Sequence, residues 1–584
     1  YCMPETRCST SENSAFHHLS TDVPLEKMRD REREDFGVSK EEDIAYSYPE
    51  FSLRPGMINF DESHEKPWIL PPLTDLTNLS TQTKVETPSL GSYQVAWIPG
   101  DPENPQDRTL ASKHLITIGC CIMAFNVALA SSAPSSAFAA ITHEFDVSDE
   151  MATCVTSIFL CGYIAGPLLW GPLSELIGRQ PVVLGTFAAF ILFQLGAALR
   201  ISFPALLASR ALTGFFGSGS LCNSGAVIAD VWDSVHRAHA LSWQVTMPFL
   251  GTALGPVLGS AINKSGLGYP WIFWSIMILS VATWFLIFFT VPETYSPILL
   301  VKKAKKLRET TGDVRFYAEH EKANCSFIGI LRRTLLRPVE MMMTEPILLL
   351  ILVYFSTIFG ILFSLFETFP IIWQEKRGFN SYQTSMIFIG IAFGSVLGRF
   401  VHLFLAIPMK RMVNKWYGHP PCEMNLHGAM GAGPMLVGGI FWLGWTGTNA
   451  HITWWVPALS TVLLGMSFNM VFISLQCYMI DVYLTYAASA LAASTICRAI
   501  VGAVVPLFTR QMYIGLGTQW ACTLIGSFSL IISLSPFIFY KYGSKIRAKS
   551  KFSSALDLQM KERIDAEDKK RILDLLASKS NFQV

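Results

Sequence analysis

Two charged residues, Arg210 and Glu367, lie inside long apolar stretches, where a charge is unfavourable. An unpaired cation in a lipid-embedded helix costs at least ~2.5 kcal/mol, so Arg210 should have a partner or water beside it. Burial disfavours the ionised form of a carboxyl group, so Glu367 could exchange protons near neutral pH. The alternatives are a structural arginine bonded to carbonyls and a solvated carboxylate at the mouth of a span. We expect Arg399 and Arg498 to be anchors near an aqueous end.

The short polar connection GPLSELIGRQP joins two apolar runs and carries opposite charges. Glu175 and Arg179 are four residues apart and could form an ion pair in one arrangement of the protein that opens in another, which is the property of a gate. Gly171 and Gly178 lack side chains and would let the helix ends approach their neighbours closely. Asp230 ends a later span and is a further gate candidate. The alternative interpretation is that these are solvated turn residues.

Phenylalanine and amide side chains within the apolar runs are candidates for binding an apolar substrate. Phenylalanines three or four residues apart share one helix face, and one run contains Phe355, Phe359, Phe363, Phe366 and Phe369. Aromatic rings supply apolar area and attract organic cations. We expect the substrate cavity to include Phe359, Phe363, Phe366, Asn126, Asn223, Gln244 and Asn469. Phenylalanines that face lipid or fill the core are the alternative for the stripe.

Such residues require a membrane-spanning scaffold, and the composition predicts one. The 584 residues are 51% hydrophobic and 15% charged, against roughly 25% charged in soluble domains. Apolar runs of about 20 residues cross the hydrocarbon core as helices. No secretory signal precedes them, so we expect the first span to direct insertion. We place twelve spans, in two sets of six, at about 113–137, 151–172, 181–200, 204–229, 238–262 and 270–291, then 346–371, 383–408, 428–447, 453–478, 485–509 and 518–540.

Polar segments divide the chain and predict its orientation. Residues 1–112 are rich in Ser, Pro, Glu and Asp, as in a disordered tail, and 541–584 form a basic C-terminal tail. Between the bundles at 113–291 and 346–540, the connection 292–345 carries ten basic residues. Because basic loops remain in the cytoplasm, we expect this connection and both termini to be cytoplasmic.

Several other function classes have no support in the sequence. The net charge of +1 does not favour nucleic acid as a partner, and the 12 cysteines lack metal-ligand spacing. The sequence has no Walker phosphate loop and no nucleophile elbow. We therefore expect no enzyme activity, no cofactor, no bound metal and no ATP-driven step.

The connection GPLSELIGRQP resembles the loop 2–3 signature of the major facilitator superfamily, which has a glycine, an acid four residues on, and then Gly-Arg. In that family the loop takes part in gating interactions of the inward-closed state. This sequence has Glu175 in place of the usual aspartate and Leu176 where a basic residue is frequent. These two departures put part of the usual charge network in doubt.

Three other stretches resemble the proton-coupled drug antiporters of that superfamily. SRALTGFFGSGS places Arg210 and Gly214 at matching positions, which implies a proton-coupling role for the arginine. VPETYSPILLVKKAKKLR looks like the corresponding segment of fungal multidrug antiporters with twelve spans. GTALGPVLGS resembles the antiporter signature of span 5, which is thought to limit leak; ordinary small-residue packing is the alternative. Its matching residues are Gly251, Gly255, Pro256 and Gly259.

This resemblance covers about residues 110–552 and implies an all-α membrane protein with the two-bundle major facilitator fold. It implies secondary active efflux of small amphipathic compounds, such as drugs, fungicides or fungal toxins, in exchange for protons by alternating access. A polyamine transporter of the same fold and a transport-dead receptor or scaffold are the alternatives. We expect a monomer in the lipid bilayer of the plasma membrane, with the vacuolar membrane second.

Overall fold

The computed structural model describes residues 93–98, 100–322, 327–407, 421–553 and 569, all within one compact unit of the chain. Apart from an isolated bridge between Gln94 and Tyr317, the regular structure of these residues is helical. The predictions for residues 1–92 and for the end of the C-terminal tail lie outside the described residues.

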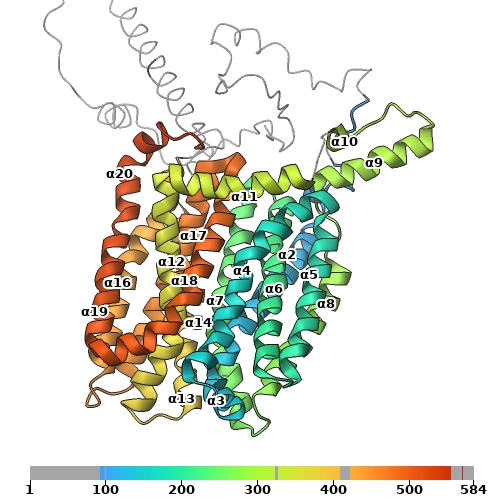
Figure 1. The fold of residues 1–584 in the computed structure, drawn as a ribbon. Helices are drawn as coiled ribbons and strands as arrows, with labels where there is room; N and C mark the ends of the chain where they lie inside the picture. The colour runs from blue at the N-terminus through green and yellow to red at the C-terminus, as the bar shows by residue number, and fades with distance from the viewer. Residues whose placement is uncertain (1–92, 99, 323–326, 408–420, 554–568, 570–584) are drawn as a thin grey trace, which may run out of the picture. The chain divides into compact units, whose positions relative to one another are not determined.

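Membrane-length helices form two bundles, as the hydropathy pattern predicts (Figure 1). The first bundle contains α2 (Leu110–Ser132), continued by η3 (Ala133–Ala137) and α3 (Phe138–Phe145), then α4 (Asp149–Ile177), α5 (Arg179–Ala198), α6 (Phe203–Val231), α7 (Ser234–Lys264) and α8 (Pro270–Thr290). The second contains α12 (Pro346–Phe369) continued by η4 (Pro370–Glu375), α13 (Ser381–Met386) with α14 (Phe388–Leu405), η5 (Cys422–Leu426) with α16 (His427–Gly447), α17 (Trp455–Tyr483), α18 (Ala487–Leu516), and α19 (Thr518–Ser533) with α20 (Ser535–Arg547). The all-α, two-bundle fold is confirmed.

Eleven of these helical stretches are long and apolar enough to cross a membrane by composition alone, and α6 is the exception. Its sequence contains four glycines and four serines, which lower its mean hydropathy. The helix packs against α2, α4 and α5, and much of one face is buried. Because interior helices meet protein rather than lipid, they favour small residues that let backbones approach closely.

The two bundles use equivalent helix pairings. In the first, α4 packs on α6, α2 on α7, and α5 on both α6 and α8. In the second, α14 packs on α17, α12 on α18, and α16 on both α17 and α19. Glycines make the same crossing possible in each, since a Cβ at Gly214 would lie 2.0 Å from the Phe159 carbonyl and one at Gly465 would lie 2.2 Å from the Ile391 carbonyl. This repetition is typical of transporters built from duplicated six-helix units.

The polar connection between the bundles is itself largely helical. It contains α9 (Ser296–Thr311), α10 (Glu319–Lys322) and α11 (Phe327–Thr344). Figure 1 shows α11 lying across one end of both bundles, and it contacts α4 of the first bundle and both α12 and α18 of the second. We call the end that carries α9 and α11 the basic end, and the end that carries α3 and α13 the opposite end.

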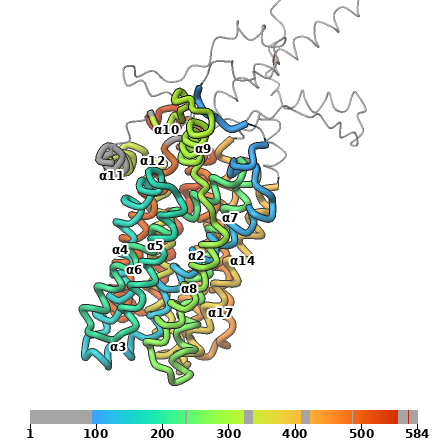
Figure 2. Tube along the Cα trace, turned by 90° about the vertical axis from the view of Figure 1, so that its right-hand side faces the viewer, coloured from blue at the N-terminus to red at the C-terminus, as the bar shows by residue number. Residues whose placement is uncertain are grey.

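Residues 93–98 and 100–107 are ordered, although the sequence places them in a disordered tail. The Val95 amide donates to the Tyr317 carbonyl at 2.9 Å, and the Tyr317 amide donates to the Tyr93 carbonyl at 3.0 Å. Val95 is buried with Ala304 and Ala318, and the segment runs beside α9 and α10 (Figure 2). The average composition of the tail conceals this short stretch, whose apolar side chains have a surface to pack on.

Candidate functional site

The turn between α4 and α5 consists of one residue, Gly178, at the basic end. Its φ of 112° is unfavourable for residues with a Cβ. A Cβ at this position would also lie 2.3 Å from the Oε2 atom of Glu293. Both the backbone angle and the close approach therefore require glycine. The close approach expected at Gly171 is not observed, because a Cβ there would meet open space.

Arg179 is the centre of the charge network expected at this turn. Its Nε atom lies 3.2 Å from an Asp230 carboxylate oxygen, and Nη1 donates to the Ser174 hydroxyl. The Glu175 carboxylate is farther from Arg179, at 3.9 Å, and its side chain is 46% exposed. The guanidinium also lies 4.9 Å from the Tyr295 ring centroid. The structure thus brings the predicted residues together, with Asp230 as the closer acidic partner.

Glu293 is a member of this network that sequence reasoning missed. Its carboxylate accepts hydrogen bonds from the backbone amides of Arg179 and Gln180, at 3.0 and 3.3 Å, at the start of α5. It also accepts from the amides of Thr294 and Tyr295, both at 2.9 Å. A carboxylate at a helix N-terminus satisfies free amides and favours the helix dipole. The signal was present, since Glu293 is the acid in the VPETYSP stretch.

Arg210 is fully buried within the first bundle and binds backbone carbonyls. Nε donates to the Val155 carbonyl at 3.2 Å and Nη2 to the Ser131 carbonyl at 3.4 Å, while the Phe159 ring lies 4.4 Å away. Among the described residues, Nη1 has no hydrogen-bond partner. These contacts agree with the structural alternative for this arginine, and its proton-coupling role stays a prediction.

Glu367 is a buried contact between the bundles near the opposite end. Its Oε1 atom accepts a hydrogen bond from the Thr153 hydroxyl of α4 at 3.1 Å, and its side chain is 8% exposed. Its charged neighbours are Asp149, Glu150 and Arg510. Among the described residues, no ion pair within 4 Å joins Glu367 to Arg210, so the two candidates for proton coupling are not in direct contact.

The glycines of the antiporter signature form a packing seam on α7. Cβ atoms at Gly251, Gly255 and Gly259 would lie 2.4 Å from the Phe125 carbonyl oxygen, 2.0 Å from the Ser132 hydroxyl and 2.1 Å from the Ser136 hydroxyl, respectively. α7 therefore rests directly on α2 and η3 of its own bundle. The helix continues through Pro256, which lies between two of these contacts. Close packing is what the structure shows, and a role in limiting leak stays a prediction.

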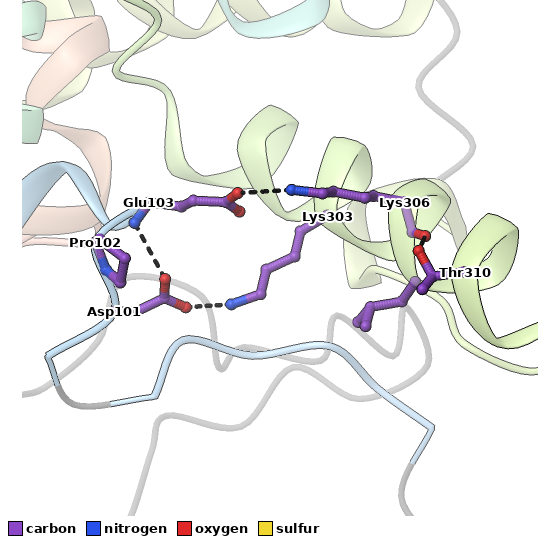
Figure 3. Close-up of a pocket in the computed structure, with 7 residues that line it drawn as sticks. Asp101, Pro102, Glu103, Lys303, Lys306 and Thr310 are labelled. Atoms are coloured by element: carbon purple, nitrogen blue, oxygen red, sulfur yellow. Dashed lines mark hydrogen bonds and ion pairs between the residues drawn. The ribbon is translucent and has the colours of Figure 1, made fainter.

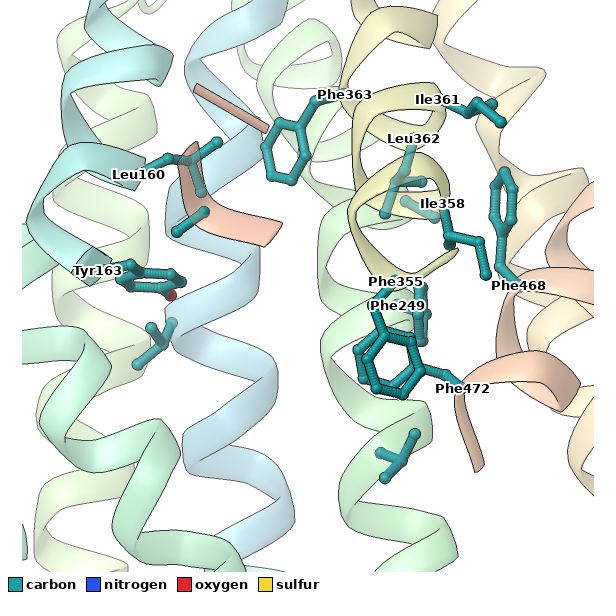
Figure 4. Close-up of a cluster of buried hydrophobic side chains, with 14 of the residues drawn as sticks. Leu160, Tyr163, Phe249, Phe355, Ile358, Ile361, Leu362, Phe363, Phe468 and Phe472 are labelled. Atoms are coloured by element: carbon teal, nitrogen blue, oxygen red, sulfur yellow. The ribbon is translucent and has the colours of Figure 1, made fainter. Parts of the chain in front are cut away.

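The bundles meet at a cluster of aromatic side chains, three of which are labelled in Figure 4. We call Phe249 of α7, Phe355 and Phe359 of α12, and Phe472 of α17 the central aromatic cluster. The Phe355 and Phe472 rings stack with centroids 4.3 Å apart, while Phe249 lies 5.3 Å from Phe472 and 6.4 Å from Phe359. Asn469 of α17 donates to the Thr246 hydroxyl of α7 at 3.0 Å. Residues of both bundles thus form one apolar cluster with polar groups at its edge.

Some predicted cavity residues lie at this cluster and others do not. Phe359 belongs to it, and Asn469 lies at its edge, three residues before Phe472 on α17. The Phe363 ring is next, with its centroid 5.9 Å from that of Phe359. Phe366 packs against Phe388 of its own bundle.

The other amides bond within the first bundle. Asn126 donates to Thr283 of α8 at 2.6 Å, and Gln244 donates to Ser224 of α6 at 3.2 Å. Asn223 donates to a carbonyl of its own helix. The bonds of Asn126 and Gln244 join helices of one bundle, and that of Asn223 stays within α6. The cavity role expected for these three amides therefore has no support from their contacts.

Two arginines expected near an aqueous end lie between the bundles instead. Arg399 of α14 is 1% exposed, and its guanidinium lies 3.7 Å from the Trp243 ring centroid on α7. The Arg498 guanidinium of α18 lies 5.2 and 5.1 Å from the rings of Phe359 and Phe472. These contacts give the anchor interpretation no support for either arginine. Their helices are apolar on several faces, which hid the inward orientation from sequence reasoning.

Two bundles with equivalent pairings, joined around a buried aromatic site, define a membrane transport protein of the duplicated six-helix class. The sequence model of the Major Facilitator Superfamily matches residues 120–506. The chain belongs to this superfamily.

Two curated relatives and one solved structure illustrate the similarity. The chain is 37% identical to the citrinin biosynthesis cluster MFS transporter mrr1 of Monascus ruber, over 82% of this chain and 96% of the relative. It is 36% identical to the MFS-type efflux pump MFS2 of Trichophyton rubrum, over 81% of this chain and 80% of the relative. The crystal structure of the human organic anion transporter MFSD10 (TETRAN) has a similar fold, with a TM-score of 0.50 and 19% identity over 74% of this chain and 99% of that one.

Proposed function

We propose that the protein is a secondary active efflux transporter that exports small amphipathic organic compounds in exchange for protons. The observation that carries the proposal is the central aromatic cluster, which combines apolar area from both bundles with the amide of Asn469. Aromatic sites of this kind bind apolar molecules of varied shape. A relative over most of the chain is named an efflux pump, which supports the outward direction.

Alternating access would expose this cluster first to one side of the membrane and then to the other. The Arg179–Asp230 network and Glu293 would hold the α4–α5 turn at the basic end. Glu367 is the candidate for proton exchange, because protonation would change a carboxylate that accepts a bond from Thr153 across the bundles. Arg210 would influence coupling from within the first bundle.

The orientation and location are parts of the same proposal. The basic residues of the central connection favour a cytoplasmic basic end, with both termini on that side. A monomer in the plasma membrane suits an exporter of this kind.

The proposed function is tested with labelled compounds in pump-depleted yeast that produce the protein. The panel contains a neutral amphipath, an apolar cation, an aromatic acid and spermidine. Export of at least one amphipath that stops with a proton uncoupler supports the proposal. Selective movement of spermidine would favour the polyamine alternative, and no movement of any compound in the panel would count against a broad efflux function.

A further inference from the structure

The interior of the bundles contains arginines without acidic partners. Among the described residues, Arg210, Arg399 and Arg498 form no ion pair with a carboxylate within 4 Å. The buried carboxyl group of Glu367 accepts from Thr153 and lies near a different cation, Arg510. Uncompensated positive charge in a region of low dielectric attracts anions.

Arg498 differs from the other two because it lies at the central aromatic cluster. Arg210 uses two donors on backbone carbonyls, and Arg399 stacks on Trp243. Arg498 is only partly buried, and Nη2 donates to the Thr495 hydroxyl of its own helix at 3.1 Å. A guanidinium has five N–H donors, so most of those on Arg498 are available to a ligand.

The face of α18 that carries Arg498 meets the first bundle. A Cβ at Gly502, one turn later, would lie 3.3 Å from Leu160 of α4 and 3.5 Å from Phe363 of α12. Leu160 and Tyr163 lie on α4, across from the aromatic residues of the second bundle (Figure 4). Arg498 is thus held where both bundles can contact the same molecule.

Tyr163 supplies a second, independent group at this place. Its side chain is 6% exposed, and among the described residues its hydroxyl has no hydrogen-bond partner. It lies on α4 one turn after Leu160, the residue that packs at Gly502 on α18, the helix that carries Arg498. A buried hydroxyl without a partner is unfavourable, so it is suited to donate to a bound molecule.

Resting on the proposed transport function, we infer that the substrates are amphipathic organic acids. Arg498 and the Tyr163 hydroxyl bind the carboxylate, and the rings of Phe249, Phe359 and Phe472 contact the apolar part. A guanidinium pairs with a carboxylate through two parallel charge-assisted hydrogen bonds, and the anion compensates the interior charge. Polyamines would add positive charge at the same place, so the site disfavours them.

The test compares 1-naphthoic acid with its uncharged analogue 1-naphthamide, which has nearly the same shape. Uncoupler-sensitive export of both labelled compounds is measured in pump-depleted yeast. The wild type should export the acid at least about tenfold faster than the amide, since charged hydrogen bonds are worth about 10- to 150-fold in binding. Arg498→Gln should lower export of the acid by a similar factor and leave the amide within about twofold.

Further variants separate recognition from folding. Arg498→Lys keeps the positive charge but lacks the planar guanidinium that can bind a carboxylate through two parallel hydrogen bonds. Export of the acid by this variant should fall about three- to tenfold. In Tyr163→Phe, which lacks the hydroxyl, export of the acid should fall about two- to tenfold. Arg200→Gln is the matched control, because Arg200 pairs with Glu144 at the opposite end and is nearly half exposed. In purified protein, the Kd for 1-naphthoate should rise at least about tenfold in Arg498→Gln and stay unchanged in Arg200→Gln.

Two results would overturn the inference while the transport function stands. One is export of the amide or an apolar cation without export of the acid. The other is an equal loss for acid and amide in Arg498→Gln at equal protein level. Failure of the wild type to move any member of the panel would instead remove the proposed function, and this inference with it.

Discussion

At the scale of single residues, Glu293 shows how one carboxylate holds a turn together. Its carboxylate accepts hydrogen bonds from four backbone amides, two of which are at the start of α5. Glu293→Ala should lower the free energy of unfolding by about 2–4 kcal/mol, because buried amides lose a charged acceptor. Thermal unfolding in detergent measures the change. Glu309→Gln on exposed α9 is the control, and an equal loss there would contradict the argument.

Glu367 carries the prediction for proton coupling. Glu367→Gln keeps an oxygen that can accept from Thr153 but removes the group that titrates. Uncoupler-sensitive export should fall at least about tenfold, while exchange of labelled for unlabelled substrate, which needs no net proton movement, should continue. If uncoupler-sensitive export were unchanged, Glu367 would have no coupling role.

At the scale of helices, the glycine seam of α7 predicts a steep dependence on side-chain size. A Cβ at Gly255 would lie 2.0 Å from the Ser132 hydroxyl and 2.7 Å from the Ala133 amide nitrogen. Gly255→Ala should therefore destabilise the protein by about 1–3 kcal/mol through overpacking. Gly438→Ala is the matched control, since it lies inside α16 with open space around the Cβ position. The unfolding temperature should fall in Gly255→Ala and not in Gly438→Ala, and an equal fall in both variants would contradict the prediction.

Two ion pairs contribute to holding the segment before α2 on α9 (Figure 3). Lys303 pairs with Asp101, and Lys306 lies 3.5 Å from Glu103. The hydrogen bond from Lys303 lowers the pKa of Asp101, so this contribution is present above the ordinary aspartate pKa and is lost as the pH falls through the lowered value.

Lys303→Glu should therefore release the segment, and Asp101→Lys combined with Lys303→Glu should restore it. Hydrogen exchange of residues 93–103 measures the release, and the protection factors of the wild type, which correct for the intrinsic exchange rate at each pH, should also fall below about pH 4. Protection that survives in Lys303→Glu would show that the apolar contacts of Val95 suffice.

At the scale of the whole molecule, contacts across the opposite end must break if that end opens. Gln511 of α18 donates to Glu150 of α4 at 3.2 Å. In a background without reactive cysteines, a cleavable thiol cross-linker between Glu150→Cys and Gln511→Cys should stop transport, and reductant should restore it. The control pair, Glu144→Cys and Arg200→Cys, joins residues of one bundle at the same end and should leave transport intact. Equal effects of both pairs would exclude this opening.

The positions of the helices could be predicted from the sequence, but the neighbours that each helix face contacts could not. Apolar run length marked all the spans, including α6, because each needs about 20 residues to cross lipid. It did not distinguish amides that join helices of one bundle, such as Asn126, from Asn469, which joins the two. The ring contacts of Arg498 could not be predicted for the same reason, since Phe359 and Phe472 come from other helices. Short ordered stretches such as residues 93–98 were hidden by the composition around them.

The position of Arg498 has a consequence for the driving force. A carboxylate that leaves the cell as an anion moves out of a compartment that is electrically negative inside. Each unit of charge gains about 2.3 kcal/mol per 100 mV of membrane potential. Export of such an acid is thus driven by the voltage across the membrane as well as by the proton concentration difference, and it should accelerate when the membrane is hyperpolarised at constant pH.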